Sequence, residues 1–97
     1  MSKTHNIELD INLCDAVLSG EKSFEIRWND RGYQKGDYVK FKPVSGGGLL
    51  NEFHEVSRRK YQITYVLSGW GLKENWVAFG IKEVKNEESD DCVLRDV

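Results

Sequence analysis

Three charged side chains, Lys22, Glu25 and Arg27, lie within six residues of one another near the start of the chain. The alternation of apolar and polar residues over 22–28 predicts a β-strand, in which successive side chains point to opposite faces. Glu25 and Arg27 therefore share one face with Ser23. Lys22 lies at the beginning of the strand and need not follow the alternation.

Two cations beside one carboxylate are suited to a ligand that carries a phosphate or carboxylate together with a hydrogen-bond donor. Arg27 would offer its planar fork to an oxyanion, and Glu25 would accept a hydrogen bond from an amino or hydroxyl group. A desolvated, neutral Lys22 could instead act as a base or nucleophile, although Glu25 nearby favours a charged lysine that binds. The alternative is an exposed structural salt bridge, worth less than about 1 kcal/mol.

Three further side chains are candidates for the same surface. Arg31, in the turn after the strand, could extend a positive rim, and Trp70 could stack on a base from its glycine-flanked loop. His5 either binds the ligand or is a strand histidine whose hydrogen bonds are satisfied within the protein. Two separated histidines and two distant cysteines give no metal-ligand spacing, so we expect no metal and no cofactor.

The remaining elements are expected to be short strands and one early helix. The patterns predict strands over 5–11, 22–28, 38–43, 60–67 and 76–84, and a helix that follows an N-cap at Asn12 and ends at Gly20. Pro43 is expected to end its strand, residues 45–50 to form a flexible loop, and residues 53–59 to form a loop or sheet edge. This order indicates a mainly β (α+β) fold, a small barrel of five or more strands with one or two short helices.

Length and charge limit the classes of protein to consider. A chain of 97 residues has room for one hydrophobic core, which we place in residues 1–86, and residues 87–97 form an acidic tail that we expect to be disordered. Residues 1–86 carry 13 Lys and Arg against 11 Asp and Glu. This excess of positive charge is too small for a protein that binds long duplex DNA. No apolar run approaches the roughly 20 residues that span a bilayer. We therefore expect a cytoplasmic protein with two free thiols, Cys14 and Cys92, and no membrane partner.

The segment from Gly20 to Arg27 fits the pattern G-x-K-x-x-E-x-R and resembles the signature of ASCH domains, a branch of the PUA-like superfamily. The similarity continues in Asn29-Asp30-Arg31, Gly36-Asp37 and 63–67, and over roughly 5–83 it resembles the DUF3850 subgroup of bacteria and their phages. The resemblance implies a β-barrel with one or two helices. It also implies a cleft beside the motif that binds RNA or a nucleotide-sized ligand, with His5 near that cleft.

Some small ASCH relatives are amidohydrolases of acetylated cytidine, and others are ribonucleases. In the amidohydrolases a lysine that matches Lys22 is catalytic, but Glu25 stands where they have a threonine. Glu74 is only a candidate for their later glutamate. We therefore expect an RNA- or nucleotide-binding module, with a small hydrolase using Lys22 and Glu25 as one alternative. A module that binds a protein partner is the other alternative.

Overall fold

The computed structural model describes residues 2–50 and 53–85 of the chain, and the predicted tail lies outside this range. The elements in chain order are β1 (Thr4–Asp10), α1 (Ile11–Ser19), β2 (Phe24–Trp28), β3 (Tyr38–Ser45), the 3-10 turn η1 (Gly46–Gly48), β4 (Leu49–Leu50), the 3-10 turn η2 (Glu55–Arg58), β5 (Tyr61–Leu67) and β6 (Trp76–Glu83). Among the described residues, no helix is both long and apolar enough to cross a bilayer.

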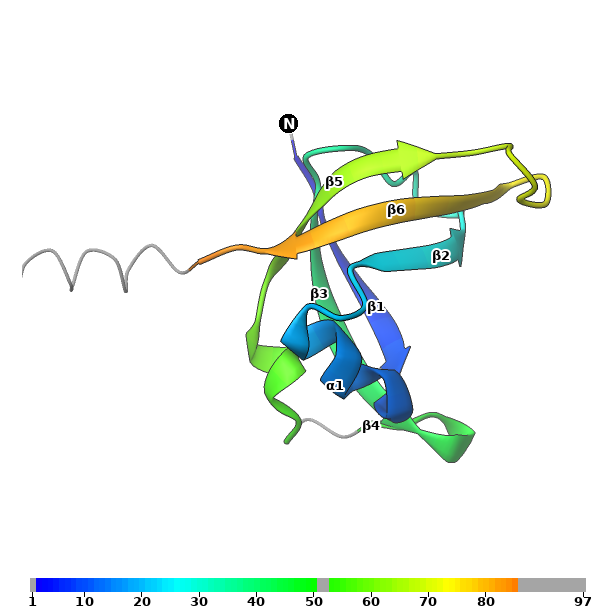
Figure 1. Ribbon diagram of the computed structural model, residues 1–97. Coiled ribbons are helices and arrows are strands. Elements are labelled where there is room, and N and C mark those ends of the chain that lie inside the picture. The colour runs from blue at the N-terminus through cyan, green and yellow to red at the C-terminus, as the bar shows by residue number, and fades with distance from the viewer. Residues whose placement is uncertain (1, 51–52, 86–97) are drawn as a thin grey trace, which may run out of the picture.

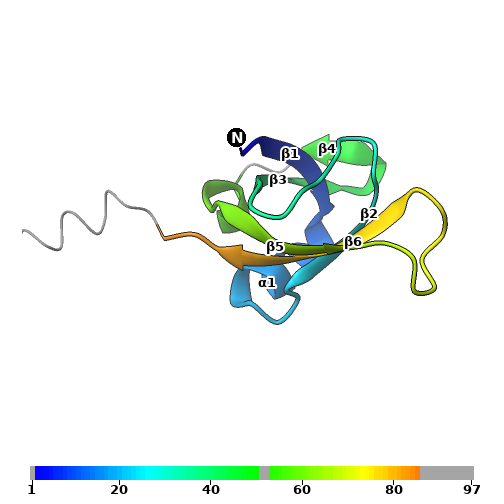
Figure 2. The same cartoon turned by 90° about the horizontal axis from the view of Figure 1, so that it is seen from above.

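One sheet contains all the described strands. Its order is β1-β3-β5-β6-β2, with β4 folded back on β3, and it curls into a half-barrel (Figures 1 and 2). β1 runs parallel to β3, whereas β3–β5, β5–β6 and β6–β2 are antiparallel. The predicted fold, a mainly β small barrel with short helices, is confirmed. The curl leaves β1 and β2 as the two edge strands of this path, and no ladder joins them.

The N-cap of α1 lies two residues earlier than predicted, and the helix begins at Ile11. Asp10, not Asn12, is the cap, because its Oδ1 accepts a hydrogen bond of 2.8 Å from the Asn12 N–H. The expectation for Asn12 was therefore wrong. The predicted stop is confirmed: Gly20 has φ of 87°, a left-handed conformation, and its N–H donates to the Val17 carbonyl.

Pro43 does not end its strand, as had been expected, because β3 continues to Ser45. The Tyr38 N–H donates to the Lys3 carbonyl, so the main-chain groups of even-numbered residues in β3 face β1. Those of Pro43 face the other side, where β5 pairs only with Tyr38 and Val39. β4, on the same side, pairs only with Val44 and Ser45, so the missing N–H of proline costs no ladder hydrogen bond among the described residues.

The segment 53–59 forms neither the loop nor the sheet edge that was expected. It contains η2, which places Val56 fully in the core. His54 caps this turn, because its Nδ1 accepts from the Val56 N–H at 3.0 Å and its Nε2 lies 2.7 Å from Asp15 on α1. Residues 45–50 were expected to form a flexible loop, but Ser45 ends β3 and residues 46–50 form η1 and the short strand β4.

The core lies in the curl of the sheet beneath α1. It consists of Ile7, Leu9, Cys14, Val17, Tyr33, Val39, Phe41, Val56, Tyr61, Ile63, Val77, Phe79 and Ile81. Cys14 is a free thiol, as predicted, and its side chain is buried. Burial, helped by the neighbouring carboxylates Asp15 and Asp10, raises its pKa to about 11, so this thiol is unreactive at neutral pH.

A buried polar pair, His5 and Asp37, connects β1 to the residue that precedes β3. The His5 Nε2 lies 2.8 Å from Asp37 Oδ2, and the His5 ring packs against Tyr33 with centroids 4.8 Å apart. Asp37 also accepts main-chain hydrogen bonds of 3.2 Å from Lys3 and Gln34. Burial acts to raise the pKa of Asp37, but these hydrogen bonds outweigh it and the pKa is lowered.

We predict that Asp37→Asn lowers the free energy of unfolding by about 2 kcal/mol at pH 7, since hydrogen bonds to a charged acceptor are lost. A carboxyl whose folded-state pKa lies below its ordinary value of 3.8 stabilises the fold above that pH. That contribution disappears as the pH falls through the folded-state value. Urea unfolding of both proteins from pH 7 to pH 2.5 should show their difference shrinking below pH 3.8. A difference that stays constant would contradict the assignment.

Candidate functional site

β2 has its charged face turned toward the interior of the molecule. Glu25 is only 3% exposed, whereas Phe24, Ile26 and Trp28 are about half exposed. The predicted alternation is therefore correct. The two faces, however, are arranged in the opposite sense to an ordinary amphipathic strand, because the carboxylate is inside and the large apolar side chains are outside.

Both carboxylate oxygens of Glu25 are occupied by cations. The Lys22 ammonium donates to Oε2, and the Arg27 guanidinium donates to Oε1 from Nε at 3.0 Å and from Nη2 at 2.9 Å. A buried carboxylate is tolerated only when its charge and lone pairs are satisfied in this way. The predicted cluster of Lys22, Glu25 and Arg27 is therefore one connected unit.

Two arginines, one in β2 and one in the turn after it, reach β1 where no strand ladder connects the two strands. The Arg27 Nη2 donates to the Glu8 carbonyl at 2.8 Å, and the Arg31 Nη1 donates to the Asn6 carbonyl at 2.7 Å. Glu8 and Asn6 are two residues apart, so their carbonyls point to the same, unpaired side of β1. Guanidinium groups thus bridge the gap between the two edge strands.

An open cleft of about 770 Å³ lies along this gap. It is lined by Asn6, Ile7, Glu8, Leu9, Asp10, Leu13, Lys22, Phe24, Glu25, Ile26, Arg27, Trp28, Asp30, Arg31, Tyr33, Lys42 and Trp76. The apolar wall comes mainly from β2, and Trp28 meets Trp76 edge to face with ring centroids 6.1 Å apart. The described lining residues include four cations and four carboxylates, so the cleft as a whole is close to neutral.

The structure brings four of the predicted site residues to this cleft: Lys22, Glu25, Arg27 and Arg31. Ser23 does not line it but faces a smaller hollow of about 160 Å³ beside the end of α1. His5 is buried behind Tyr33 and bonded to Asp37, outside the cleft lining. It is thus a satisfied strand histidine, which was one of its two expected roles.

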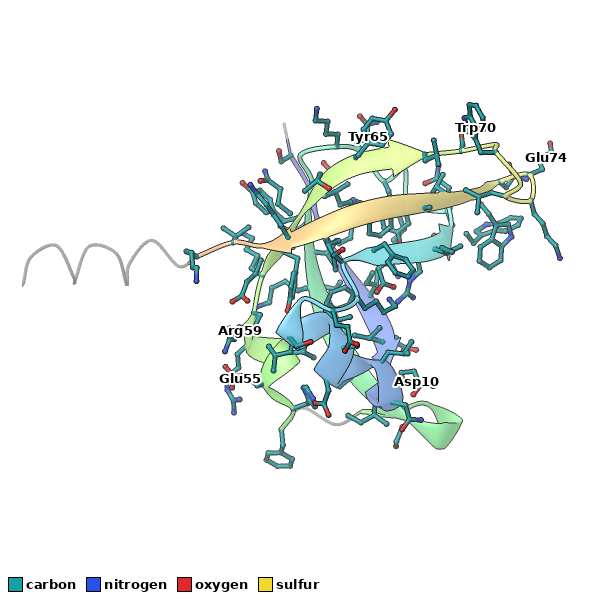
Figure 3. The ribbon with its side chains drawn as sticks, in the orientation of Figure 1. Asp10, Glu55, Arg59, Tyr65, Trp70 and Glu74 are labelled. Carbon is teal, nitrogen blue, oxygen red and sulfur yellow. The ribbon has the colours of Figure 1, made fainter. Side chains whose placement is uncertain are left out.

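Trp70 and Glu74 lie away from the cleft, in the loop between β5 and β6. This hairpin projects beyond the rest of the sheet, and the Trp70 ring stands out from it, 88% exposed (Figure 3). Glu74 lies at the tip of the same loop (Figure 3). Neither residue lines the cleft, so a ligand held there would have to extend well beyond it to reach Trp70.

The sequence interpretation missed the apolar wall. The alternation predicted over 22–28 also places Phe24, Ile26 and Trp28 on one face, but only the polar face of the strand was selected as a working surface. A strand with large apolar residues on one face normally buries that face. The available signal was the charge cluster itself, because three charged groups so close together can satisfy one another in the interior and free the apolar face for the outside.

We predict that Glu25→Gln lowers the free energy of unfolding by about 3 kcal/mol, since removing one partner leaves two adjacent cations without their counter-charge. For a domain of this size the melting temperature should fall by about 12 °C or more. Glu21→Gln, at an exposed neighbouring position with no ion pair among the described residues, is the matched control and should change stability by less than about 0.5 kcal/mol. Equal melting temperatures for the two variants would mean that the Glu25 cluster is not a structural requirement.

Comparison with known families supports part of the resemblance seen in the sequence. No curated protein matches the chain. A family model described as "Domain of unknown function (DUF3850)" matches residues 4–81, which include every described strand except the last two residues of β6. The match also contains the whole of the Lys22–Glu25–Arg27 cluster and both edges of the cleft. The chain therefore belongs to the DUF3850 family.

Proposed function

We propose that the cleft binds an unpaired segment of RNA or a nucleotide-like ligand, as the resemblance to ASCH and PUA-like modules implies. The observation that carries this proposal is the row of half-exposed apolar side chains on β2, which stands directly beside the Lys22–Glu25–Arg27 cluster. Aromatic surface next to fixed cations is the combination that binds single-stranded nucleic acid, because bases stack and phosphates pair.

The apolar wall of the cleft is exposed enough for a ligand to contact it. Phe24 and Trp28 each keep 49% of their surface exposed, although both are large apolar residues. The Lys22 ammonium lies 5.1 Å from the centre of the Phe24 ring, so a ligand group on that ring would also meet a positive charge. A base that stacked here would remove this apolar surface from water.

The two arginines have N–H groups that are not used in the hydrogen bonds described above. Arg27 uses Nε and Nη2 for Glu25 and Glu8, and no partner is found among the described residues for its Nη1. Arg31 uses one Nη1 hydrogen bond to hold β1. These groups could each meet one phosphate or sugar oxygen, and the carboxylates of the lining limit the attraction for a long polyanion.

Hydrolysis is the less favoured function for this site. The Lys22 ammonium donates to the Glu25 carboxylate and, at 2.9 Å, to the Phe24 carbonyl. An amine that attacks a substrate or removes a proton needs a free lone pair, which these two hydrogen bonds oppose. Glu74 lies outside the cleft lining, so it does not supply the later glutamate of the amidohydrolases there. A protein partner is the other alternative, and no observation in the described residues favours it over RNA.

We predict that Trp28→Ala weakens the binding of a single-stranded RNA oligomer by about fivefold to 150-fold, the loss of one base stacked on an aromatic ring. Tyr65→Ala is the control, since Tyr65 is an exposed aromatic residue outside the cleft lining. Fluorescence anisotropy with a labelled ten-nucleotide RNA measures both. Trp70→Ala in the same assay tests whether the ligand reaches the hairpin. If the unmodified protein binds none of a panel of RNA oligomers and nucleosides, the proposed function is wrong.

We also predict a weak dependence of this binding on salt. Two or three phosphate contacts on a single strand give a slope of log affinity against log salt of about −1.4 to −2. Arg31→Ala should remove one phosphate contact and so reduce the magnitude of the slope by about 0.7. Lys73→Ala, in the β5–β6 loop outside the cleft lining, should leave the slope unchanged. Titrations between 50 and 300 mM salt measure the slope. A steep slope in the unmodified protein would mean a polyanion surface much larger than this cleft.

A further inference from the structure

The outer edge of β2 presents main-chain groups to the cleft. The Ile81 N–H donates to the Ser23 carbonyl, and the Asn29 N–H donates to the Asn75 carbonyl. These two hydrogen bonds fix the register, so the main-chain groups of odd-numbered residues from Ser23 to Asn29 point toward β6. Those of Phe24, Ile26 and Trp28 point the other way, to the side that faces β1.

Most of the carbonyls along this gap already have a partner. The Phe24 carbonyl accepts from the Lys22 ammonium at 2.9 Å, and the Trp28 carbonyl accepts from the Asp30 N–H at 2.8 Å. On the opposite edge, the Asn6 and Glu8 carbonyls accept from arginines, as described above. An added peptide strand needs a continuous row of free groups, and this edge does not offer one.

Ile26 is the exception. Its carbonyl, unlike those of Phe24 and Trp28, has no partner among the described residues, and neither has its N–H. The register turns both groups toward the side that faces β1, and Ile26 is one of the residues that line the cleft. They form an adjacent donor and acceptor, flanked by the Phe24 and Trp28 side chains and opposite the arginine bridges. A neighbouring acceptor and donor in one plane is what the Watson–Crick edge of every unpaired nucleobase provides.

We propose that the main chain of Ile26 reads the Watson–Crick edge of one unpaired base. This inference rests on the proposed function and specifies how the ligand is recognised. With uracil, the Ile26 carbonyl accepts from N3–H and the Ile26 N–H donates to the neighbouring exocyclic oxygen. With adenine, the N–H donates to N1 and the carbonyl accepts from the exocyclic amine. In both cases the base must have no pairing partner, so a duplex is excluded.

A methyl group on that edge is the most direct test. N3-methyluridine lacks the donor that the Ile26 carbonyl requires, while its ring, sugar and charge match those of uridine. We therefore compare uridine 5′-monophosphate with its N3-methyl counterpart, using two-dimensional amide NMR of the ¹⁵N-labelled full chain. Uridine 5′-monophosphate should shift the Ile26 amide resonance strongly, and the methylated nucleotide should bind about threefold to tenfold more weakly, as the loss of one hydrogen bond implies.

A variant tests the same contact from the protein side. Ile26→Pro removes the N–H, and because that group faces the open edge of the sheet, no β2–β6 hydrogen bond is lost. It should bind uridine 5′-monophosphate about threefold to tenfold more weakly. Ile26→Val keeps the N–H, so the difference in affinity between Ile26→Val and Ile26→Pro isolates that group. Tyr65→Ala, outside the cleft lining, should leave the affinity unchanged. If Ile26→Pro does not fold, the NMR comparison on the unmodified chain decides alone.

The outcomes separate this inference from the proposed function. Discrimination against the methylated nucleotide, with a shift at Ile26, supports both. Equal binding of the two nucleotides, or binding that leaves the Ile26 amide unchanged, overturns main-chain reading and leaves the cleft as a nucleotide site of another kind. Absence of binding to either nucleotide and to single-stranded RNA overturns the proposed function, and the inference with it.

Discussion

The structure depends on the burial of one carboxylate. Glu25 is almost fully removed from water, and its charge is acceptable there only because Lys22 and Arg27 satisfy both of its oxygens. Side chains alternate along a strand, so an inward Glu25 forces Phe24 and Ile26 outward. The orientation of the whole of β2, and with it the apolar wall of the cleft, follows from the pairing of that single charge.

The same cluster determines how the half-barrel is closed. A closed barrel removes unpaired strand edges by joining its first and last strands with a continuous ladder. Here Arg27, which also bonds Glu25, reaches across to the Glu8 carbonyl, and Arg31 reaches Asn6. A side-chain bridge spans a wider gap than a main-chain hydrogen bond does. The edges are therefore held in place without being brought together, and the remaining space is the cleft.

Local patterns predicted most of the elements, because their causes are local. The β-branched and aromatic run at 61–67, the left-handed stop at Gly20 and the alternation in β2 all operate within a few residues. η2 was not predicted, since it is fixed by the packing of Val56 into the core and by the pair between His54 and Asp15 on α1. Both contacts join residues that are distant in sequence.

The candidate site was predictable only in part, for the same physical reason. The spacing of Lys22, Glu25 and Arg27 could be read directly, and the structure brings these residues together. Which face of β2 is buried could not be read, because hydrophobicity alone favours the opposite arrangement. The partner carbonyls on β1 depend on the curl of the entire sheet, and they belong to the main chain, so no side-chain pattern records them.

The balance of charge in the cleft indicates where selectivity must arise. With equal numbers of cations and carboxylates among its described lining residues, the cleft produces little long-range attraction for a polyanion. The acidic residues 87–97 add further negative charge to the chain. A ligand is therefore not concentrated by the field of the protein, and discrimination must come from short-range contacts within the cleft. Apolar surface on β2 and fixed main-chain groups at its edge provide such contacts, and both depend on Glu25 keeping the strand in its inverted orientation.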